Sequence, residues 1–173
     1  MKKSEKDYLR KVPLLAELSD DELEVFSSIL KPVKIKEGEI IVVEGESGEN
    51  MYLFREGLVE VTAQITLPVG ERKNWFDTEK SIARMSPDKM TFFGEMSLIT
   101  GAPRSATIKA LQPCLLYEIT KEDFENLAIK YPVIGYKILK AIVFILSNRI
   151  RELNQSVLKL TTALSIVVSK QKK

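Results

Sequence analysis

The chain has 173 residues, of which 45% are hydrophobic and 29% are charged, and its formal net charge is +2. These values are ordinary for a globular protein, and the length predicts a single domain with one appendage. The small net charge gives no sign of a surface that binds a nucleic-acid backbone, so we expect no DNA or RNA partner.

The sequence contains one cysteine, Cys114, and no histidine. It therefore has no Ser-His or Cys-His nucleophile pair and no histidine ligand for zinc or haem, and no Asp-x-Asp spacing supports a carboxylate metal site. We expect no enzyme activity, no metal and no cofactor, and a buried Cys114. The charged amino terminus does not resemble a signal peptide, and no uncharged run approaches the roughly 20 residues needed to span a bilayer. A cytoplasmic protein without a membrane segment is expected.

Residues 1–30 are predicted to be helical, with helices at 7–12 and 20–30. The second begins at Ser19 or Asp20 as N-cap, has acidic residues in its first turn, and carries apolar residues at helical spacing.

In residues 31–120 the apolar residues recur with a period near two, which predicts short antiparallel strands in a barrel or sandwich. The predicted strands include 40–43, 51–54 and 58–61. Glycines lie between them and are expected at turns that need a positive φ: Gly38, Gly45, Gly48 and Gly57.

A loop is expected from about residue 67 to 90. It contains Trp75 and Phe76, which would either form a lid or partner contact or pack under the rim of the barrel. A further strand pair is expected within 109–120.

The segment 93–107 is the most informative in the chain. Glu95 follows a glycine at the start of a short apolar turn, and Arg104 follows nine residues later, with Ser105, Ala106 and Thr107 directly after it. Free amides at a helix start attract an anion, and an arginine fork fits phosphate oxygens. A carboxylate can accept the proton of a ribose 2′-hydroxyl, and small residues permit close approach. From chemistry alone, a surface Glu–Arg pair beside a turn is the alternative.

Residues 121–173 are predicted to be helical, with a short helix at 121–130 and a long one that begins near Pro132. Apolar residues on the long helix are spaced alternately four and three apart, which makes 133–168 a predicted coiled-coil helix. β-Branched residues at a and leucine at d favour two parallel strands. The a positions are Val143, Ile150, Val157 and Leu164, and the d positions are Leu139, Leu146, Leu153, Leu160 and Val167.

A helix of about 35 residues would be roughly 50 Å long and would overshoot a domain of this size. We therefore expect a homodimer, with Ile138, Ile142 and Ile145 packing the start of the helix on its own domain. The e and g positions carry little charge, which leaves a heterodimer with a similar chain open.

Segment 93–107 resembles the phosphate-binding cassette of cyclic nucleotide-binding domains of the catabolite activator and cAMP-dependent kinase regulatory type. Residues 36–53 resemble the first half of the same β-roll, and the similarity runs from about Tyr8 to the final helix. The resemblance implies an α+β fold, in which a jelly-roll-like antiparallel barrel is flanked by N-terminal helices and a long C-terminal helix. It implies a ligand site formed by Phe93, Gly94, Glu95, Met96, Ser97, Arg104, Ser105, Ala106 and Arg149.

In this assignment Gly94 and Glu95 meet the ribose, and Arg104 meets the cyclic phosphate with the amides near Ser97 and Ser105. The Ser105 hydroxyl and Arg149 lie where relatives read the base, although Arg149 could equally be a solvated charge.

The resulting hypothesis is a cytoplasmic sensor that binds cAMP, or alternatively cGMP, and signals through its last helix to an unidentified protein. The rival is a degenerate domain that acts as a dimeric interaction module without nucleotide. A transcription factor would need a helix-turn-helix after the dimer helix, and a channel domain would need a membrane span.

Overall fold

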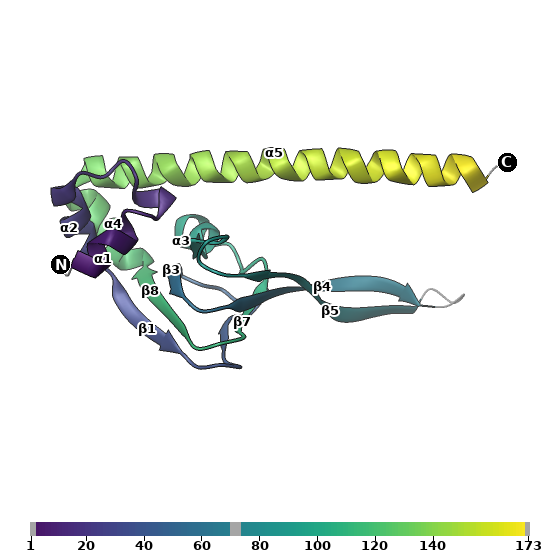
Figure 1. The fold of residues 1–173 in the computed structure, drawn as a ribbon, viewed down its shortest axis with the longest axis horizontal. Coiled ribbons are helices and arrows are strands. Elements are labelled where there is room, and N and C mark those ends of the chain that lie inside the picture. Colours follow the sequence, from purple (N-terminus) through teal and green to yellow (C-terminus); the bar gives the residue numbers. More distant parts are fainter. Residues whose placement is uncertain (1–2, 70–73, 172–173) are drawn as a thin grey trace.

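The computed structural model describes the backbone of residues 3–69 and 74–171, while the side chains of 65–79 and of residues after 169 lie outside the description. Two four-stranded antiparallel sheets form the centre of the molecule, in the orders β1-β8-β3-β6 and β2-β7-β4-β5. Helices cover one side of this barrel, and α5 runs the whole length of the molecule (Figure 1). The strands are β1 (Lys31–Ile35), β2 (Ile40–Val42), β3 (Asn50–Glu56), β4 (Val59–Val69), β5 (Asn74–Met85), β6 (Phe92–Phe93), β7 (Thr107–Ala110) and β8 (Cys114–Thr120).

The N-terminal helices differ from their predicted ranges. Helix α1 spans Lys3–Leu9, and the chain continues through a 3-10 turn at Pro13–Leu15. The predicted range 7–12 is wrong because the residue before Pro13 is extended rather than helical, as the proline ring requires.

Helix α2 spans Asp20–Ser27 rather than 20–30. Its N-cap is Ser19, whose hydroxyl accepts from the Glu22 amide at 3.2 Å while the Glu22 carboxylate accepts from the Ser19 amide at 2.7 Å. This capping box is the motif expected for the helix start. At the other end, the hydroxyls of Ser27 and Ser28 donate to carbonyls three residues earlier, which favours termination there.

Two apolar clusters hold the barrel and helices together. The smaller cluster lies between the sheets and includes Phe54, Phe93 and Ile108. Cys114 belongs to it and is buried, which confirms the expectation. The larger cluster joins the outer face of β3 and β8 to the helices, and its members are Leu9, Val12, Leu14, Leu15, Leu18, Leu23, Phe26, Met51, Leu53, Phe92, Leu98, Tyr117, Ile119, Phe124, Leu127, Ile134, Ile138 and Ile142.

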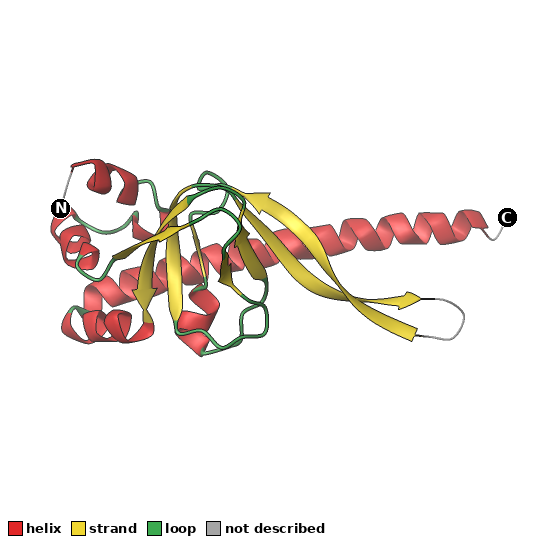
Figure 2. Ribbon diagram, turned by 90° about the horizontal axis from the view of Figure 1, so that it is seen from below, coloured by secondary structure: helices red, strands yellow, loops and turns green. Residues whose placement is uncertain are grey.

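Most of the described part of segment 67–90 is strand rather than the expected loop, because β4 and β5 pair from Val59–Met85 to Val69–Asn74 with one register shift, and only residues 86–90 follow β5 outside the strands. β-Branched and aromatic residues around Pro68 and Gly70 favour strand over loop. A bulge at Ile82, between the Val61 and Thr62 pairs, bends and twists the ribbon where it leaves the barrel. The result is a long hairpin that projects beside α5 (Figures 1 and 2). Trp75 and Phe76 lie in β5, and their side chains are outside the described part of the chain, so both predicted roles stay predictions.

Helix α4 spans Lys121–Lys130, as predicted, and α5 spans Pro132–Gln171 with 40 residues, about 60 Å. The first half of α5 is anchored on the domain by Ile138 and Ile142, which are buried, and by Ile145, which is partly buried. This contact confirms the expected second apolar face. Two ion pairs join α5 to the N-terminal segment, namely Lys137–Glu22 at 2.6 Å and Lys140–Glu17 at 3.0 Å. Within the parts of the chain that the structure describes, no helix has both the length and the apolarity to cross a membrane.

Candidate functional site

The predicted cassette folds as a strand, a tight turn and a short helix. Strand β6 ends at Phe93, Gly94 takes a φ of +84°, and helix α3 (Glu95–Thr100) follows. Only glycine adopts this left-handed conformation without strain. Gly101, at φ +69°, ends the helix by donating its N–H to the Ser97 carbonyl. The chain then returns through a loop to β7, and this loop presents Arg104.

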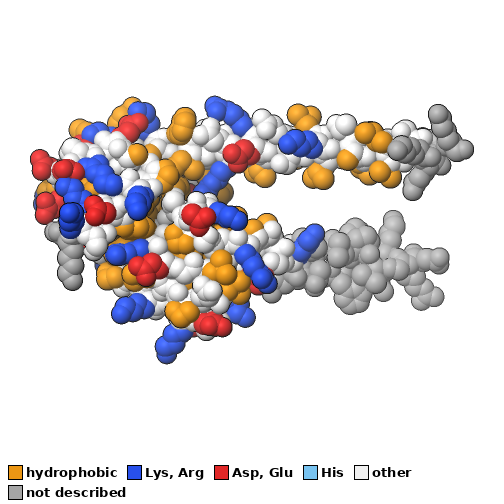
Figure 3. Space-filling model, in the orientation of Figure 1, with side chains coloured by type: hydrophobic (Ala, Val, Ile, Leu, Met, Phe, Trp, Pro, Cys, Tyr) orange, Lys and Arg blue, Asp and Glu red, His pale blue; other side chains and the backbone are white. Residues whose placement is uncertain are grey.

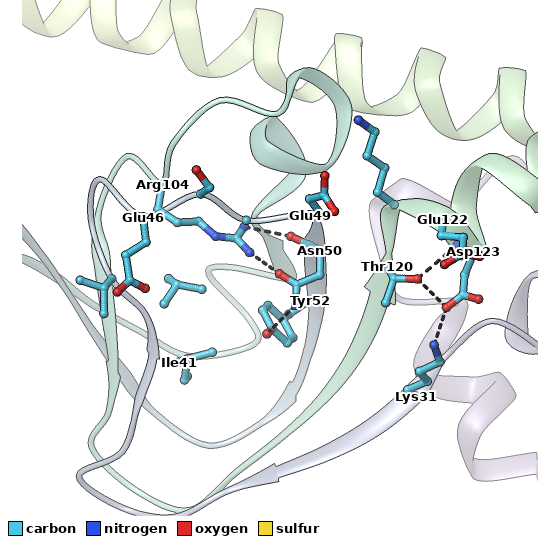
Figure 4. Close-up of a pocket in the computed structure, with 15 residues that line it drawn as sticks. Lys31, Ile41, Glu46, Glu49, Asn50, Tyr52, Arg104, Thr120, Glu122 and Asp123 are labelled. Carbon is cyan, nitrogen blue, oxygen red and sulfur yellow. Dashed lines mark hydrogen bonds and ion pairs between the residues drawn. The ribbon is translucent and has the colours of Figure 1, made fainter.

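Arg104 is 7% exposed, and its guanidinium is fixed by the chain itself. Nη1 donates to the Asn50 carbonyl at 2.9 Å and makes a longer contact of 3.5 Å with the Gly94 carbonyl, while Nη2 donates to Asn50 Oδ1. Figure 4 shows the bonds to Asn50, which stands on β3. Burial lowers the pKa of Arg104 from its usual value, and electrostatic interactions with Tyr52 and Glu95 oppose this shift. These bonds use three of the five N–H groups of the guanidinium, which leaves two for a ligand.

Two glycines make room for this side chain. A Cβ at Gly48 would lie 2.3 Å from Arg104 Nε, and a Cβ at Gly94 would lie 2.6 Å from Nη1. Gly48 was predicted to need a positive φ, and this prediction is wrong, because positive values occur at Gly38, Gly45 and Gly57 but not at Gly48. Glycine is required at position 48 because the Arg104 side chain comes too close for a Cβ.

Glu95 is buried and paired with α5. Its carboxylate lies 2.7 Å from Arg149 Nη1, and the two side chains are 5% and 44% exposed. The Arg149 guanidinium also lies over the Phe92 ring, 5.3 Å from its centroid, within cation–π range. Arg149 is thus not a purely solvated charge, because it links the long helix to the cassette at the carboxylate expected to meet the ribose.

The cassette and α5 enclose a cavity of about 450 Å³. All nine residues expected at the ligand site line it. Phe93 and Ser97 are buried, Met96 and Ser105 are exposed, and Ala106 is half-buried. The remaining lining residues are Val42, Val61, Met90, Ile108, Leu146, Ile150 and Leu153.

Sequence reasoning missed this apolar lining as part of the site. Val42, Val61 and Ile108 come from three different strands, and no local pattern joins them. Ile150 and Leu153 were predicted only as a and d positions of the heptad, which together form the seam, the apolar stripe through which two helices would pair. Their place in the cavity follows from the way α5 lies over the cassette.

The charges around this cavity sum to +1, because Arg104 and Arg149 contribute two positive charges and Glu95 one negative charge, and the other lining residues are uncharged. A cyclic phosphodiester carries one negative charge, whereas a nucleoside triphosphate carries several. The site is thus electrostatically matched to a monoanion in otherwise apolar surroundings.

Arg104 also borders a second cavity, of about 520 Å³, which is drawn in Figure 4. Its walls are mostly polar, and they include the Lys31–Asp123 ion pair of 2.6 Å. Asn50 lies on this side and donates its Nδ2 to the Tyr52 hydroxyl at 2.9 Å. The second cavity therefore holds the groups that position Arg104. Among the described residues no cluster of three or more His, Cys, Asp or Glu could hold a metal ion.

Comparison with known proteins supports the family resemblance found in the sequence. Residues 32–131 match the cyclic nucleotide-binding domain family. Over 121 residues, 70% of this chain and 35% of the relative, the sequence is 31% identical to the cAMP-dependent protein kinase regulatory subunit of Dictyostelium discoideum. The same subunit of Candida albicans is 30% identical, with 23% of its length covered. The chain thus spans about a third or less of the length of these curated relatives.

Among solved structures, the N-terminal domain of a transcriptional regulator from Streptomyces coelicolor A3(2) is similar, with a TM-score of 0.66 and 27% identity over 87% of this chain and 95% of that one. The catabolite activator protein of Thermus thermophilus has a TM-score of 0.68 at 24% identity over 86% of this chain and 63% of that one, and supports the fold alone. The family match covers more than half of the chain and contains the whole cassette. The chain therefore belongs to the cyclic nucleotide-binding domain family.

Proposed function

We propose that this chain is a sensor of a 3′,5′-cyclic mononucleotide, with cAMP preferred over cGMP, and that it signals through α5 to a protein partner. The observation that carries the proposal is the cavity between the cassette and α5, with its charge of +1, its preset Arg104 and its apolar walls. The cAMP-dependent kinase regulatory subunits to which the chain is similar have cAMP in their names. This supports adenine over guanine.

Each part of the ligand has a partner in the cavity. The cyclic phosphate would take the two remaining N–H groups of Arg104 and the first amides of α3, which have no acceptor within the helix. The ribose 2′-hydroxyl would donate to Glu95. The base would lie against the aliphatic side chains from β2, β4 and β7, where Ser105 and Arg149 supply polar contacts.

We further propose that α5 forms a parallel homodimer. From Arg151 to Ser169 every described side chain of α5 is exposed, so this half of the helix is not covered by its own domain. The a and d residues there include Val157, Leu160 and Leu164, which are 58%, 70% and 64% exposed. Over the whole helix the a residues are β-branched except Leu164 and the d residues are leucine except Val167, a pattern typical of a two-stranded coiled coil.

Ligand and dimer should be coupled, because Ile150 and Leu153 line the cavity and are also seam residues. A ligand that prefers one placement of this turn of α5 must shift the dimer equilibrium, and dimerisation must shift ligand affinity by the same factor. A coupling of about 1–3 kcal/mol changes the association constant about 5- to 150-fold.

Two measurements test the proposal. Calorimetry with cAMP and cGMP should show saturable binding of one ligand per chain, with cAMP the tighter ligand. Sedimentation equilibrium with and without saturating cAMP should show a dimer whose constant depends on the ligand. If neither nucleotide binds at millimolar concentration, the proposal is wrong and the chain is better described as a dimeric interaction module. Identical dimer constants with and without cAMP would contradict the coupling between ligand and dimer.

A further inference from the structure

A groove runs between α2 and α4, at the end of the molecule opposite the free half of α5 (Figure 1). It consists of two adjoining cavities of about 430 Å³ and 350 Å³. Val25, Lys130 and Tyr131 line both of them, so the two form one continuous depression. The smaller cavity reaches residues 132–134, the first turn of α5. A molecule bound in this groove would therefore touch the helix that is proposed to carry the signal.

The walls of the groove are largely apolar. Val25 on α2 and Ile29 just after it form one wall, and Leu127 on α4 lies opposite. Tyr131 and Val133 extend the apolar surface to the start of α5, where they are 37% and 60% exposed. An exposed apolar surface rimmed by polar groups is typical of a contact site for another protein.

The rim of the groove is acidic. Its lining includes four carboxylates and a single ammonium group, that of Lys130, so the lining charges sum to −3. The carboxylates are those of Asp21, Glu22, Glu24 and Asp123. Ion pairs of 2.6 Å with lysines outside the groove offset part of this charge, at Glu22 and Asp123. Figure 3 shows several acidic side chains at this end of the molecule. The groove is thus locally negative on a chain whose net charge is +2.

We propose that this groove receives a basic amphipathic helix of the partner protein, with two apolar side chains one turn apart over the two cavities and lysine or arginine along the α2 rim. The inference rests on the proposed signalling to a protein partner, and it names the surface of contact and the chemistry of that partner. A helix is the fitting occupant because an apolar groove with two neighbouring hollows suits anchors at i and i+4. A basic helix is favoured because the acidic rim complements it, although the chain as a whole repels cations.

The first experiment uses a synthetic probe. A dye-labelled peptide of about 18 residues, long enough to be helical, carries leucine at i, i+4 and i+7 and lysine on its other face. The control peptide has glutamate in place of every lysine. Fluorescence anisotropy with the full chain should show the lysine peptide binding at least about tenfold more tightly than the glutamate peptide. Equal affinities for the two peptides would overturn the inference.

Matched variants of the chain locate the binding. Asp21→Lys reverses a charge on the rim, and Glu125→Lys makes the same change on an exposed residue of α4 that lines neither cavity. Val133→Ser removes an apolar side chain from the groove, and Leu158→Ser does so on the far half of α5, where Leu158 is 68% exposed. Both groove variants should weaken binding of the lysine peptide at least about fivefold, while both controls stay within about twofold of wild type. Melting curves establish that all four variants are folded. Equal effects of groove and control variants would overturn the inference.

A third measurement maps the contact directly. In NMR spectra of the isotope-labelled chain, the lysine peptide should shift backbone amide signals at 21–29 and 123–134. The exposed a and d residues of α5 are the competing site for an amphipathic peptide. Shifts confined to residues 150–167 would therefore assign the binding to α5 and overturn the inference.

The inference and the proposed function fail in different ways. The groove shares no lining residue with the nucleotide cavity, so Asp21→Lys and Val133→Ser should bind cAMP with wild-type affinity in calorimetry. A wild type that binds the lysine peptide selectively but neither cAMP nor cGMP supports the groove and contradicts the sensor. A wild type that binds cAMP but does not distinguish the two peptides contradicts the groove alone.

Discussion

Replacing Arg104 with alanine tests the centre of the site. The guanidinium bonds to both acceptors of Asn50 and would hold the phosphate with its remaining N–H groups. The variant therefore leaves the phosphate of the bound ligand without its charged partner in a buried place. Truncating one member of a desolvated charge pair costs about 2–5 kcal/mol. The affinity for cAMP should fall about 30- to 5000-fold, since 1.36 kcal/mol is a factor of ten.

The assay is calorimetry on purified wild type and variant, with cAMP in both. Arg151→Ala is the matched control, because Arg151 is an exposed arginine on α5 whose described hydrogen bond goes to Asn148. It removes the same charge from the chain and should leave the affinity within about twofold. Melting curves without ligand establish that both variants are folded. An Arg104→Ala variant that is folded and binds cAMP within threefold of wild type would refute the reasoning.

Three further predictions follow from the same geometry. Gly94→Ala should lower cAMP affinity at least about tenfold by calorimetry, because its Cβ would meet Arg104 and backbone. Gly101 also has a positive φ, but the space around its Cβ is open, so the effect of Gly101→Ala should be limited to about 1–2 kcal/mol of stability in urea unfolding. Glu95→Gln should weaken binding of cAMP in calorimetry but not of 2′-deoxy-cAMP, because only the ribonucleotide has a 2′-hydroxyl that can donate a hydrogen bond to the carboxylate. The hydrogen bond from Lys137 lowers the pKa of Glu22, so the ionised Glu22 stabilises the folded wild type at neutral pH, and this stabilisation is lost as the pH falls below about 4.3. In urea unfolding, Glu22→Gln should therefore be less stable than the wild type at neutral pH, and the difference should disappear at low pH.

Each of these predictions has a result that contradicts it. Equal affinities of the two glycine variants would show that the space around Arg104 is not what requires glycine. Equal losses for both nucleotides in Glu95→Gln would remove the ribose contact. For the pH dependence, Glu125→Gln is the control, since Glu125 is exposed and no ion pair of it is described. Parallel stability curves for the two glutamine variants from pH 7 to 3 would contradict the assigned role of Glu22.

The sequence predicted those parts of the molecule whose structure is determined by residues that lie close together in the chain. The turn glycine, the acidic residue and the arginine of the cassette lie within eleven residues, and together they predicted a compact anion site at a helix start. Helix α4 was predicted with its observed bounds because Thr120 caps it and Pro132 begins the next helix. The long helix followed from its unbroken heptad.

The rest of the site depends on contacts between distant residues, which a single sequence does not encode in any local pattern. Asn50 holds Arg104 from 54 positions away, and nothing in the strand around Asn50 marks it as a ligand of an arginine. The need for glycine at position 48 has the same origin. The segment 67–90 was predicted as a loop, whereas β4 and β5 pair across much of it, and pairing between two strands is not visible in a local pattern.

The ion pair between Glu95 and Arg149 connects ligand binding with the position of α5. Glu95 is nearly inaccessible whereas Arg149 is partly exposed, so moving the helix away would leave a buried carboxylate without its counter-charge, which is costly. A ribose hydroxyl that donates to Glu95 satisfies part of that carboxylate from inside the cavity, and the phosphate beside Arg104 simultaneously attracts the Arg149 cation. The nucleotide therefore changes the free energy of holding this turn of α5 against the cassette. In the homodimer proposed above, Ile150, the next residue, would belong to the interface between the two helices, so the change would appear in their pairing as well as in the cavity.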